Sequence, residues 1–291
     1  MHPTLQSLLA RGPVITDGAW GTQMQSLGLP PGVHPDLWNL LHPDRVHEIA
    51  ARYVAAGSRV ILTNTFRSNR IALSSHGAEK TVQLNTTGVS ISKQAAGGKA
   101  AVFASIGPSG KMLISGDVSE EELSAAFGEQ ARALAAAGAD ALLLETMTDL
   151  DEALIALRAA KPTGIPVIVS MVFDSGREKD RTMMGSTPEH VAAALADAGA
   201  DAIGANCGFG IEDTLPVCAR LKKATHLPVW VKPNAGLPAM IDGKIVYSTT
   251  PEEFALRAQM LREAGADFIG GCCGTTPDFV RALVASLRTA P

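Results

Sequence analysis

The sequence predicts a single domain, residues 1–291, that folds as an α/β (β/α)₈ TIM barrel. One phrase recurs: "AAGSRVILTNTF" from Ala55, "AAGADALLLET" from Ala136, "DAGADAIGANC" from Asp197 and "EAGADFIGGCC" from Glu263. Each copy reads as a helix end, a glycine stop and then a strand. The strands are short continuous apolar runs, which is typical of a parallel sheet covered on both faces. Eight such runs, without any linker-like composition, favour a closed barrel over a doubly wound sheet.

The individual elements follow in order along the chain. Four strands lie in the recurring phrases, and the other four are "VITDGA" from Val14, "AAVFASIGP" from Ala100, "PVIVSMVF" from Pro166 and "PVWVKPN" from Pro228. Amphipathic segments predict helices between them over residues 43–56, 69–96, 119–137, 149–160, 188–198, 212–224, 251–264 and 277–287, the second of these broken in two.

The composition excludes several classes of protein. The net charge of -4, the 4% aromatic content and the lack of a dense Lys/Arg block argue against nucleic-acid binding and against a basic membrane-surface helix. No apolar run reaches the roughly 18 residues of a membrane span, and the first residues lack a basic, apolar leader. We therefore expect a cytoplasmic protein. Four cysteines in so long a chain do not form a disulfide framework, so closely spaced ones indicate metal binding or catalysis.

Polar residues close most of the apolar runs. Active sites of such barrels lie at the carboxyl ends of the strands, so these residues are expected to converge on one rim. Two carboxylates, two amides and three thiols are among them, and in order the residues are Asp17, Asn64, Ser105, Glu145, Cys207, Asn234, Cys272 and Cys273.

The three thiols suggest a metal site. The sixth and eighth strands flank the seventh, so their ends lie about 10 Å apart before the loops turn inward, and a shared metal ion can close that gap. Adjacent side chains on a strand point to opposite faces, so Cys272 and Cys273 reach one ion only if the strand ends before them. The glycines of "GGCCG" allow the backbone to leave strand geometry there. Three thiolates and one open position are typical of catalytic zinc.

Other interpretations of the cysteines remain open at this stage. Buried cysteine often serves as a small apolar core residue, and Cys218 in "LPVCARLKK" is expected to do so because it lies inside a predicted helix. A redox pair at Cys272 and Cys273 ranks below zinc, because a disulfide between adjacent residues closes a strained ring.

Seven motifs in order resemble the homocysteine S-methyltransferase family, particularly the homocysteine-binding module of cobalamin-dependent methionine synthases. The motifs are "DGAWGTQMQ", "TNTF", "IGPSGKML", "LLLETMTDL", "GANCG", "VKPNAGLP" and "GGCCGTTP". The resemblance implies Zn²⁺ held by Cys207, Cys272 and Cys273, homocysteine as substrate and methionine as product. It also implies that Asn234 occupies the vacant zinc position until homocysteine arrives, and that Asn64 and Asn206 orient ligands or substrate.

The chemistry of the residues fits this resemblance. A free thiol has a pKa of about 8.5, and binding to Zn²⁺ deprotonates it, so the substrate sulfur can attack a methyl group without a general base. Accordingly, none of the seven histidines closes a strand, and solvated or capping roles are expected for them.

The remaining rim residues suit the amino-acid end of the substrate. Glu145 and Asp17 are expected to pair with its ammonium, the alternative being a structural ion pair or a helix cap. Backbone amides of the "GAWGT" turn, including those of Ala19 and Trp20, can point at its carboxylate.

The methyl donor is expected to be methylcobalamin or another corrinoid, because "VKPNAGLP" resembles the cobalamin-type module. A separate protein or domain would supply it, since no part of this chain is expected to hold a corrinoid. Donors still open are S-methylmethionine, S-adenosylmethionine and betaine. A zinc-binding, thiol-capturing or sensory module without turnover remains an alternative of another class. A metal-free barrel with a Schiff base on Lys232 ranks last, because its sequence neighbours predict no desolvating pocket.

Overall fold

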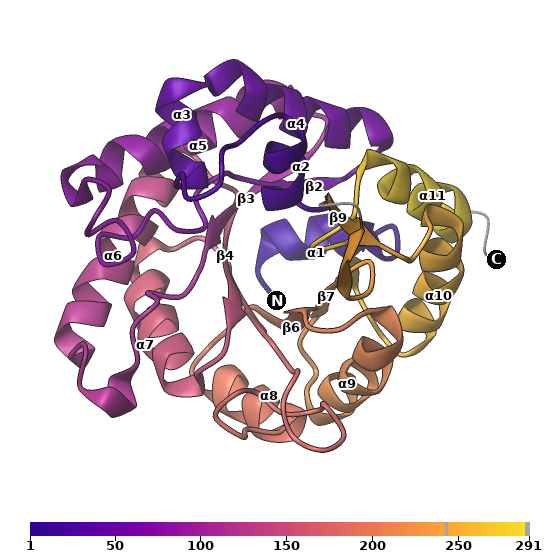
Figure 1. Cartoon of the computed structure of the whole chain (residues 1–291). Helices are drawn as coiled ribbons and strands as arrows, with labels where there is room; N and C mark the ends of the chain where they lie inside the picture. The colour runs from indigo at the N-terminus through magenta and orange to yellow at the C-terminus, as the bar shows by residue number, and fades with distance from the viewer. Residues whose placement is uncertain (242–243, 289–291) are drawn as a thin grey trace.

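A computed structural model describes residues 1–241 and 244–288, and it confirms the predicted barrel (Figure 1). Eight parallel strands lie in the order β1-β10-β7-β6-β5-β4-β3-β2, and a parallel bridge between Thr16 and Val60 joins the two ends of the sheet. The strands are β1 (Val14–Ile15), β2 (Val60–Leu62), β3 (Ala101–Ile106), β4 (Ala141–Met147), β5 (Val167–Met171), β6 (Ala202–Cys207), β7 (Val229–Pro233) and β10 (Phe268–Ile269).

The long helices surround this sheet and, apart from the first part of residues 69–96, agree closely with the predicted ranges. They are α4 (Pro43–Ala56), α5 (Thr81–Ala96), α6 (Glu120–Ala136), α7 (Leu150–Ala160), α8 (Pro188–Asp197), α9 (Ile211–Ala224), α10 (Pro251–Glu263) and α11 (Pro277–Arg288). Their starts follow from local chemistry: Ser119 and Thr250 each form a capping box with a glutamate three residues later. None of the helices described has the length and apolar character of a membrane-spanning segment.

The barrel interior is a separate apolar core. The rings of Phe103, Trp230 and Phe268 pack together there, with centroids 5.4 to 6.2 Å apart. Leu5 of α1 (Pro3–Leu9) belongs to the same cluster, so this short helix closes the amino end of the barrel, behind the strands in Figure 1. The opposite, carboxyl end is left for function.

Side-chain alternation places polar residues above this apolar layer. On β4, Ala141 and Leu143 point inward, and Glu145 follows two residues later. On β7, Trp230 points inward and Lys232 follows it. The same spacing brings Ser105, Ser170 and Asn206 into this polar layer.

Two parts of the fold differ from the sequence-based expectation. The first predicted helix of residues 69–96 is wrong: residues 70–76 form turns, in which the Asn69 side chain accepts a hydrogen bond from Ala72 N at 2.8 Å. The chain then enters α5 through a 3₁₀ turn, Ala78–Lys80. An antiparallel hairpin, β8 (Pro238–Ile241) and β9 (Lys244–Tyr247), follows β7 and was not predicted. The sequence feature that could have predicted this hairpin is the Asp-Gly pair between two runs of strand-forming residues. The short helices α2 (Gly21–Ser26) and α3 (Trp38–Leu41) were also missed.

Candidate active site

Three cysteine sulfurs meet at the carboxyl end of the barrel. Cys207 ends β6, whereas Cys272 and Cys273 lie just after β10, which ends at Ile269 as the metal hypothesis requires. The three Sγ atoms lie within 4.8 Å of one another, and those of Cys207 and Cys272 are 2.8 Å apart. All three residues are partly exposed and line a cavity of about 310 Å³.

This arrangement fits the ligands of a zinc ion. Tetrahedral Zn²⁺ with bonds of about 2.3 Å to sulfur separates its sulfur ligands by about 3.8 Å, so shifts of about 1 Å suffice. The thiols of Cys207 and Cys272 also hydrogen-bond to Cys273 and lower its pKa, so Cys273 favours the thiolate, whereas the pKa values of Cys207 and Cys272 are raised. Because the sulfurs border a cavity, a further ligand can enter from that side.

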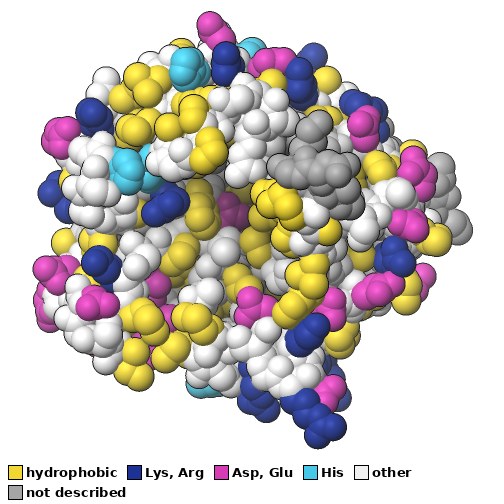
Figure 2. Space-filling view, in the orientation of Figure 1, with side chains coloured by type: hydrophobic (Ala, Val, Ile, Leu, Met, Phe, Trp, Pro, Cys, Tyr) yellow, Lys and Arg dark blue, Asp and Glu magenta, His cyan; other side chains and the backbone are white. Residues whose placement is uncertain are grey.

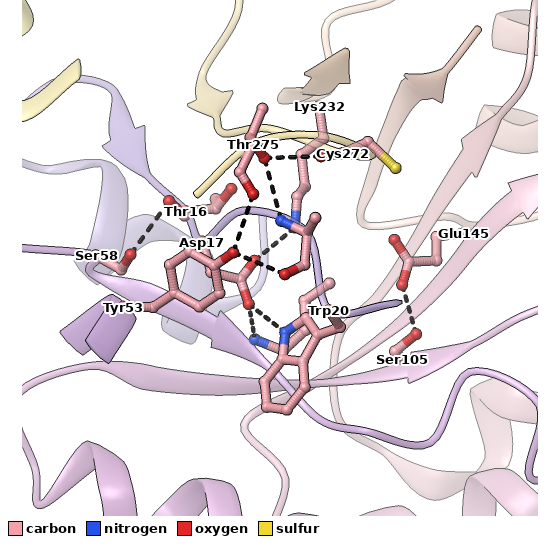
Figure 3. Close-up of polar contacts among 12 residues, drawn as sticks. Thr16, Asp17, Trp20, Tyr53, Ser58, Ser105, Glu145, Lys232, Cys272 and Thr275 are labelled. Carbon is pink, nitrogen blue, oxygen red and sulfur yellow. Dashed lines mark hydrogen bonds and ion pairs between the residues drawn. The ribbon is translucent and has the colours of Figure 1, made fainter. Parts of the chain in front are cut away.

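The cysteine loop is fixed to the turn after β1 (Figure 3). Thr275 Oγ1 accepts a hydrogen bond from Ala19 N at 3.1 Å and donates one to Cys272 O at 2.7 Å. Tyr53 donates its hydroxyl proton to Ala19 O at 2.7 Å. The approach requires glycine at position 270, because a Cβ atom there would lie 2.0 Å from Thr16 Oγ1. The Ala19 amide, one of the amides predicted to bind a carboxylate, therefore already has a partner in this structure.

The two asparagines near the cysteines hold the backbone in place. Asn234 donates to Gly208 O at 2.5 Å and accepts from Cys273 N at 3.0 Å, so it joins the two cysteine-bearing segments. It does not line the cavity, and acting as a metal ligand would require its amide to rearrange.

Asn206 bonds to the two strained residues at this rim. Thr146 and Cys207 both have a left-handed φ of 60°, which is unfavourable for their side chains. Asn206 accepts hydrogen bonds from Thr146 N at 2.9 Å and from Ser170 Oγ at 2.6 Å. It donates to Thr146 Oγ1 at 2.8 Å and to Cys207 Sγ at 3.5 Å. Asn206 thus fixes the orientation of the first sulfur.

Replacement of Asn206 by alanine is expected to weaken zinc binding by roughly 10- to 100-fold, because residues that orient ligands have effects of this size. Competition with a chromophoric chelator measures the change. Asn85→Ala is a matched control, because Asn85 is also buried and its side chain bonds, among the described residues, to Ser68 O, Thr81 O and Gln130, none of which lines the cavity. Equal loss of metal affinity in both variants would contradict the orienting role of Asn206.

The two carboxylates have different environments (Figure 3). Asp17 is fully buried and accepts three bonds, from Lys232 Nζ at 2.5 Å, Trp20 Nε1 at 2.8 Å and Leu62 N at 2.7 Å. It does not line the cavity, and its ion pair with Lys232 is the structural arrangement expected from the sequence as the alternative. Glu145 does line the cavity and accepts one bond, from Ser105 Oγ at 2.5 Å.

The Glu145 carboxyl group has a raised pKa. Burial raises the pKa of the Glu145 carboxyl to about 7, and Cys272 and Asp17 add to this, whereas Lys232 and Ser105 oppose it. An incoming ammonium would relieve this cost of burying the charge.

The expectation that Lys232 has no desolvating pocket is wrong. The residue is only 2% exposed. Burial alone would lower its pKa, but Asp17 and Glu145 outweigh that effect and raise it. The amine therefore stays protonated, which disfavours a Schiff base for a different reason.

The other predicted residues lie as follows. Trp20 and Asn64 line the cavity, and the Asn64 side chain donates to Pro35 O and Asn39 Oδ1. Cys218 is fully buried in the core, as predicted. No histidine is found among the described residues that line the cavity. One histidine prediction is wrong, since His34 is buried against His76, with ring centroids 5.0 Å apart.

The space-filling view shows this end of the molecule (Figure 2). The surface is hollowed at its centre, acidic atoms are visible inside the hollow, and hydrophobic side chains gather around its edge. Among the exposed hydrophobic residues, Met240 and Ile245 lie on the β8–β9 hairpin.

Comparison with known proteins gives consistent results. Residues 14–287 match the profile of a family described as homocysteine S-methyltransferase. The chain is 33% identical to methionine synthase of Mycobacterium leprae and 30% identical to that of Mycobacterium tuberculosis, over 97% of its length in both cases. It spans only 25% of the length of those relatives.

Solved structures show the same similarity. The metallated form of the homocysteine methyltransferase MmuM from Escherichia coli superposes with a TM-score of 0.81 at 25% identity, covering 97% of this chain and 99% of that one. Its oxidized form gives a TM-score of 0.82, also at 25% identity, covering 98% of this chain and 99% of that one.

Proposed function

Because the chain belongs to the homocysteine S-methyltransferase family, we propose that it transfers a methyl group to the thiol of homocysteine and forms methionine. The observation that carries the proposal is the cluster of three cysteine sulfurs on the wall of a cavity that the carboxyl group of Glu145 and the ammonium group of Lys232 also line. A thiol and an amino-acid end are the two parts of homocysteine that such a cavity has to bind.

In this proposal Cys207, Cys272 and Cys273 hold Zn²⁺. A zinc ion with three thiolate ligands would take the substrate thiol as its fourth ligand and keep it deprotonated and nucleophilic. Asn206 and Asn234 keep the cysteines in position, while Glu145 receives the substrate ammonium. Trp20 and Asn64 form part of the cavity wall.

We further propose a methylcorrinoid, carried by a separate protein or domain, as the methyl donor. Two relatives named methionine synthase support this choice, and their much greater length leaves room for donor-binding parts. The proposal places the protein in the methionine synthase type of the family.

A steady-state assay tests the proposed function. Purified, zinc-loaded protein is mixed with homocysteine and, in separate reactions, methylcobalamin, S-methylmethionine, S-adenosylmethionine or betaine, and methionine is quantified. We expect methionine with the corrinoid donor. Turnover with betaine alone would overturn the donor assignment. Binding of zinc and homocysteine without methionine from any donor would favour the thiol-capture alternative.

Homocysteine binding is expected to weaken as the pH falls below about 7. The Glu145 carboxyl has a pKa of about 7 without substrate, so it becomes neutral at lower pH and can no longer pair with an ammonium. Between pH 8 and pH 6 this group alone is expected to weaken binding about tenfold. Calorimetric titration across this range measures the change.

The substrate thiol titrates as well, so the contribution of Glu145 is the difference between wild type and Glu145→Gln. Identical pH profiles for the two proteins would contradict the assignment. For the substrate-free protein, the raised pKa has the opposite consequence: the contribution of Glu145 to stability is greatest below pH 4.5 and declines as the pH rises through about 7.

A further inference from the structure

Lys232 has more hydrogen-bonding capacity than its partner uses. An ammonium group has three N–H donors, and the only acceptor found for it among the described residues is Asp17 Oδ1 at 2.5 Å. Its other neighbour is the ring of Trp230, whose centroid lies 5.9 Å from Nζ. Since the side chain is 3% exposed, water reaches it poorly, yet the residue lines the cavity. Two N–H donors therefore remain for a ligand in the cavity.

The charges around the cavity favour an anion at this position. Glu145 and Asp36 place carboxyl groups on the cavity wall, and a substrate carboxylate that enters this cavity needs a cationic partner. Only Lys232 and Arg67 are cationic among the described lining residues. Arg67 is exposed, and its charge acts on His34 and Asp36. The charge of Lys232 acts on Cys272 and Glu145.

The size of homocysteine favours Lys232 over Arg67. Four bonds separate the sulfur of homocysteine from its carboxylate carbon, so a sulfur at the cysteine cluster keeps the carboxylate nearby. Of the backbone amides expected to bind the carboxylate, which include those of Ala19 and Trp20, the Ala19 amide already donates to Thr275 Oγ1. Of the two cations, Lys232 is thus the one whose charge acts both on a cysteine of the sulfur site and on Glu145, which is the proposed ammonium site.

We propose that Lys232 binds the carboxylate of homocysteine, while Glu145 binds its ammonium. Asp17 holds Lys232 in place. The two opposite charges of the amino-acid end are then matched by two opposite charges from β4 and β7, which explains why a cation is buried beside the cysteines. This inference rests on the proposed function, because it takes homocysteine as the ligand.

Two truncated substrates test the proposal. 4-Mercaptobutanoate lacks the ammonium of homocysteine, and 3-mercaptopropylamine lacks the carboxylate. Dissociation constants of both thiols and of homocysteine are measured by calorimetry with zinc-loaded wild type and Lys232→Gln. The variant is expected to bind homocysteine and 4-mercaptobutanoate roughly 10- to 100-fold more weakly, as for the loss of a charged hydrogen bond. Its affinity for 3-mercaptopropylamine is expected to change by no more than about twofold.

Two further variants keep the result unambiguous. Removing Lys232 leaves Asp17 buried and unpaired, so Asp17→Asn/Lys232→Gln, which removes both charges, serves if the single variant does not fold. The double variant is expected to show the same carboxylate-selective loss. Arg67→Gln is the control, and its affinities for both analogues are expected to stay within about twofold of wild type.

The outcomes separate this inference from the proposed function. Wild type that does not bind homocysteine would refute the proposed function and the inference with it. Wild type that binds homocysteine, with equal losses for both analogues in Lys232→Gln, would refute only the role of Lys232. Carboxylate-selective loss in Arg67→Gln would also refute it.

Discussion

Replacing Cys207 with alanine is expected to remove both the metal and the methyl transfer. Zinc sites in small domains contribute about 10–16 kcal/mol over four ligands, so each thiolate contributes about 3 kcal/mol and its loss weakens binding by roughly 10²- to 10³-fold. A homocysteine thiol without the metal would be mostly protonated near neutral pH. Elemental analysis of dialysed protein and the methionine assay measure the two losses.

Cys218 provides the matched control for this experiment. It is the one cysteine of the sequence outside the cluster, it is fully buried, and its Sγ lies 3.9 Å from Leu261 O. Cys218→Ala is expected to keep zinc and activity while losing about 1 kcal/mol of unfolding free energy. If Cys207→Ala retains stoichiometric zinc, the three-sulfur site is wrong.

Replacing Glu145 with glutamine is expected to weaken homocysteine binding by about 10²-fold, because a buried charge partner of the ammonium is lost. The amide can still accept the hydrogen bond from Ser105. Since the raised pKa shows that burial disfavours the charged carboxyl, the neutral variant is expected to unfold at the same or a higher temperature than wild type at pH 8. Calorimetric titration and thermal denaturation of the same samples measure both quantities.

Glu152 is the control for Glu145. It is also buried and also accepts a bond, from Ser109 N at 2.7 Å, but it does not line the cavity. Glu152→Gln is expected to bind homocysteine with an affinity within about twofold of wild type. A stability loss in Glu145→Gln that accounts for its weaker binding would indicate that Glu145 is a structural residue.

The barrel and the cysteine cluster could be predicted because their signals are local. Continuous apolar runs define buried strands, and the residues that end these runs lie at one rim once the strands are parallel. The position of Cys207 follows from the end of β6, and that of Cys272 from the glycines after β10.

The roles of Asp17, Ala19 and Lys232 could not be predicted in the same way, because their partners are distant in the sequence. Asp17 pairs with a residue 215 positions later, and the Ala19 amide binds one 256 positions later. In the run "PVWVKPN" apolar residues occupy both faces of the strand, so the sequence does not show that Lys232 lies on the same inward side as Trp230. The inward position of Lys232 could have been predicted from the rule that inward and outward residues alternate along each strand of a closed barrel.

The account depends on one physical claim, that three protein sulfurs hold a metal ion and leave a position for the substrate sulfur. X-ray absorption at the zinc edge of the loaded protein, recorded before and after addition of homocysteine, tests this claim most directly. We expect three sulfur ligands at about 2.3 Å before addition and four afterwards. A metal shell that keeps the same number of sulfur ligands when homocysteine binds would contradict it.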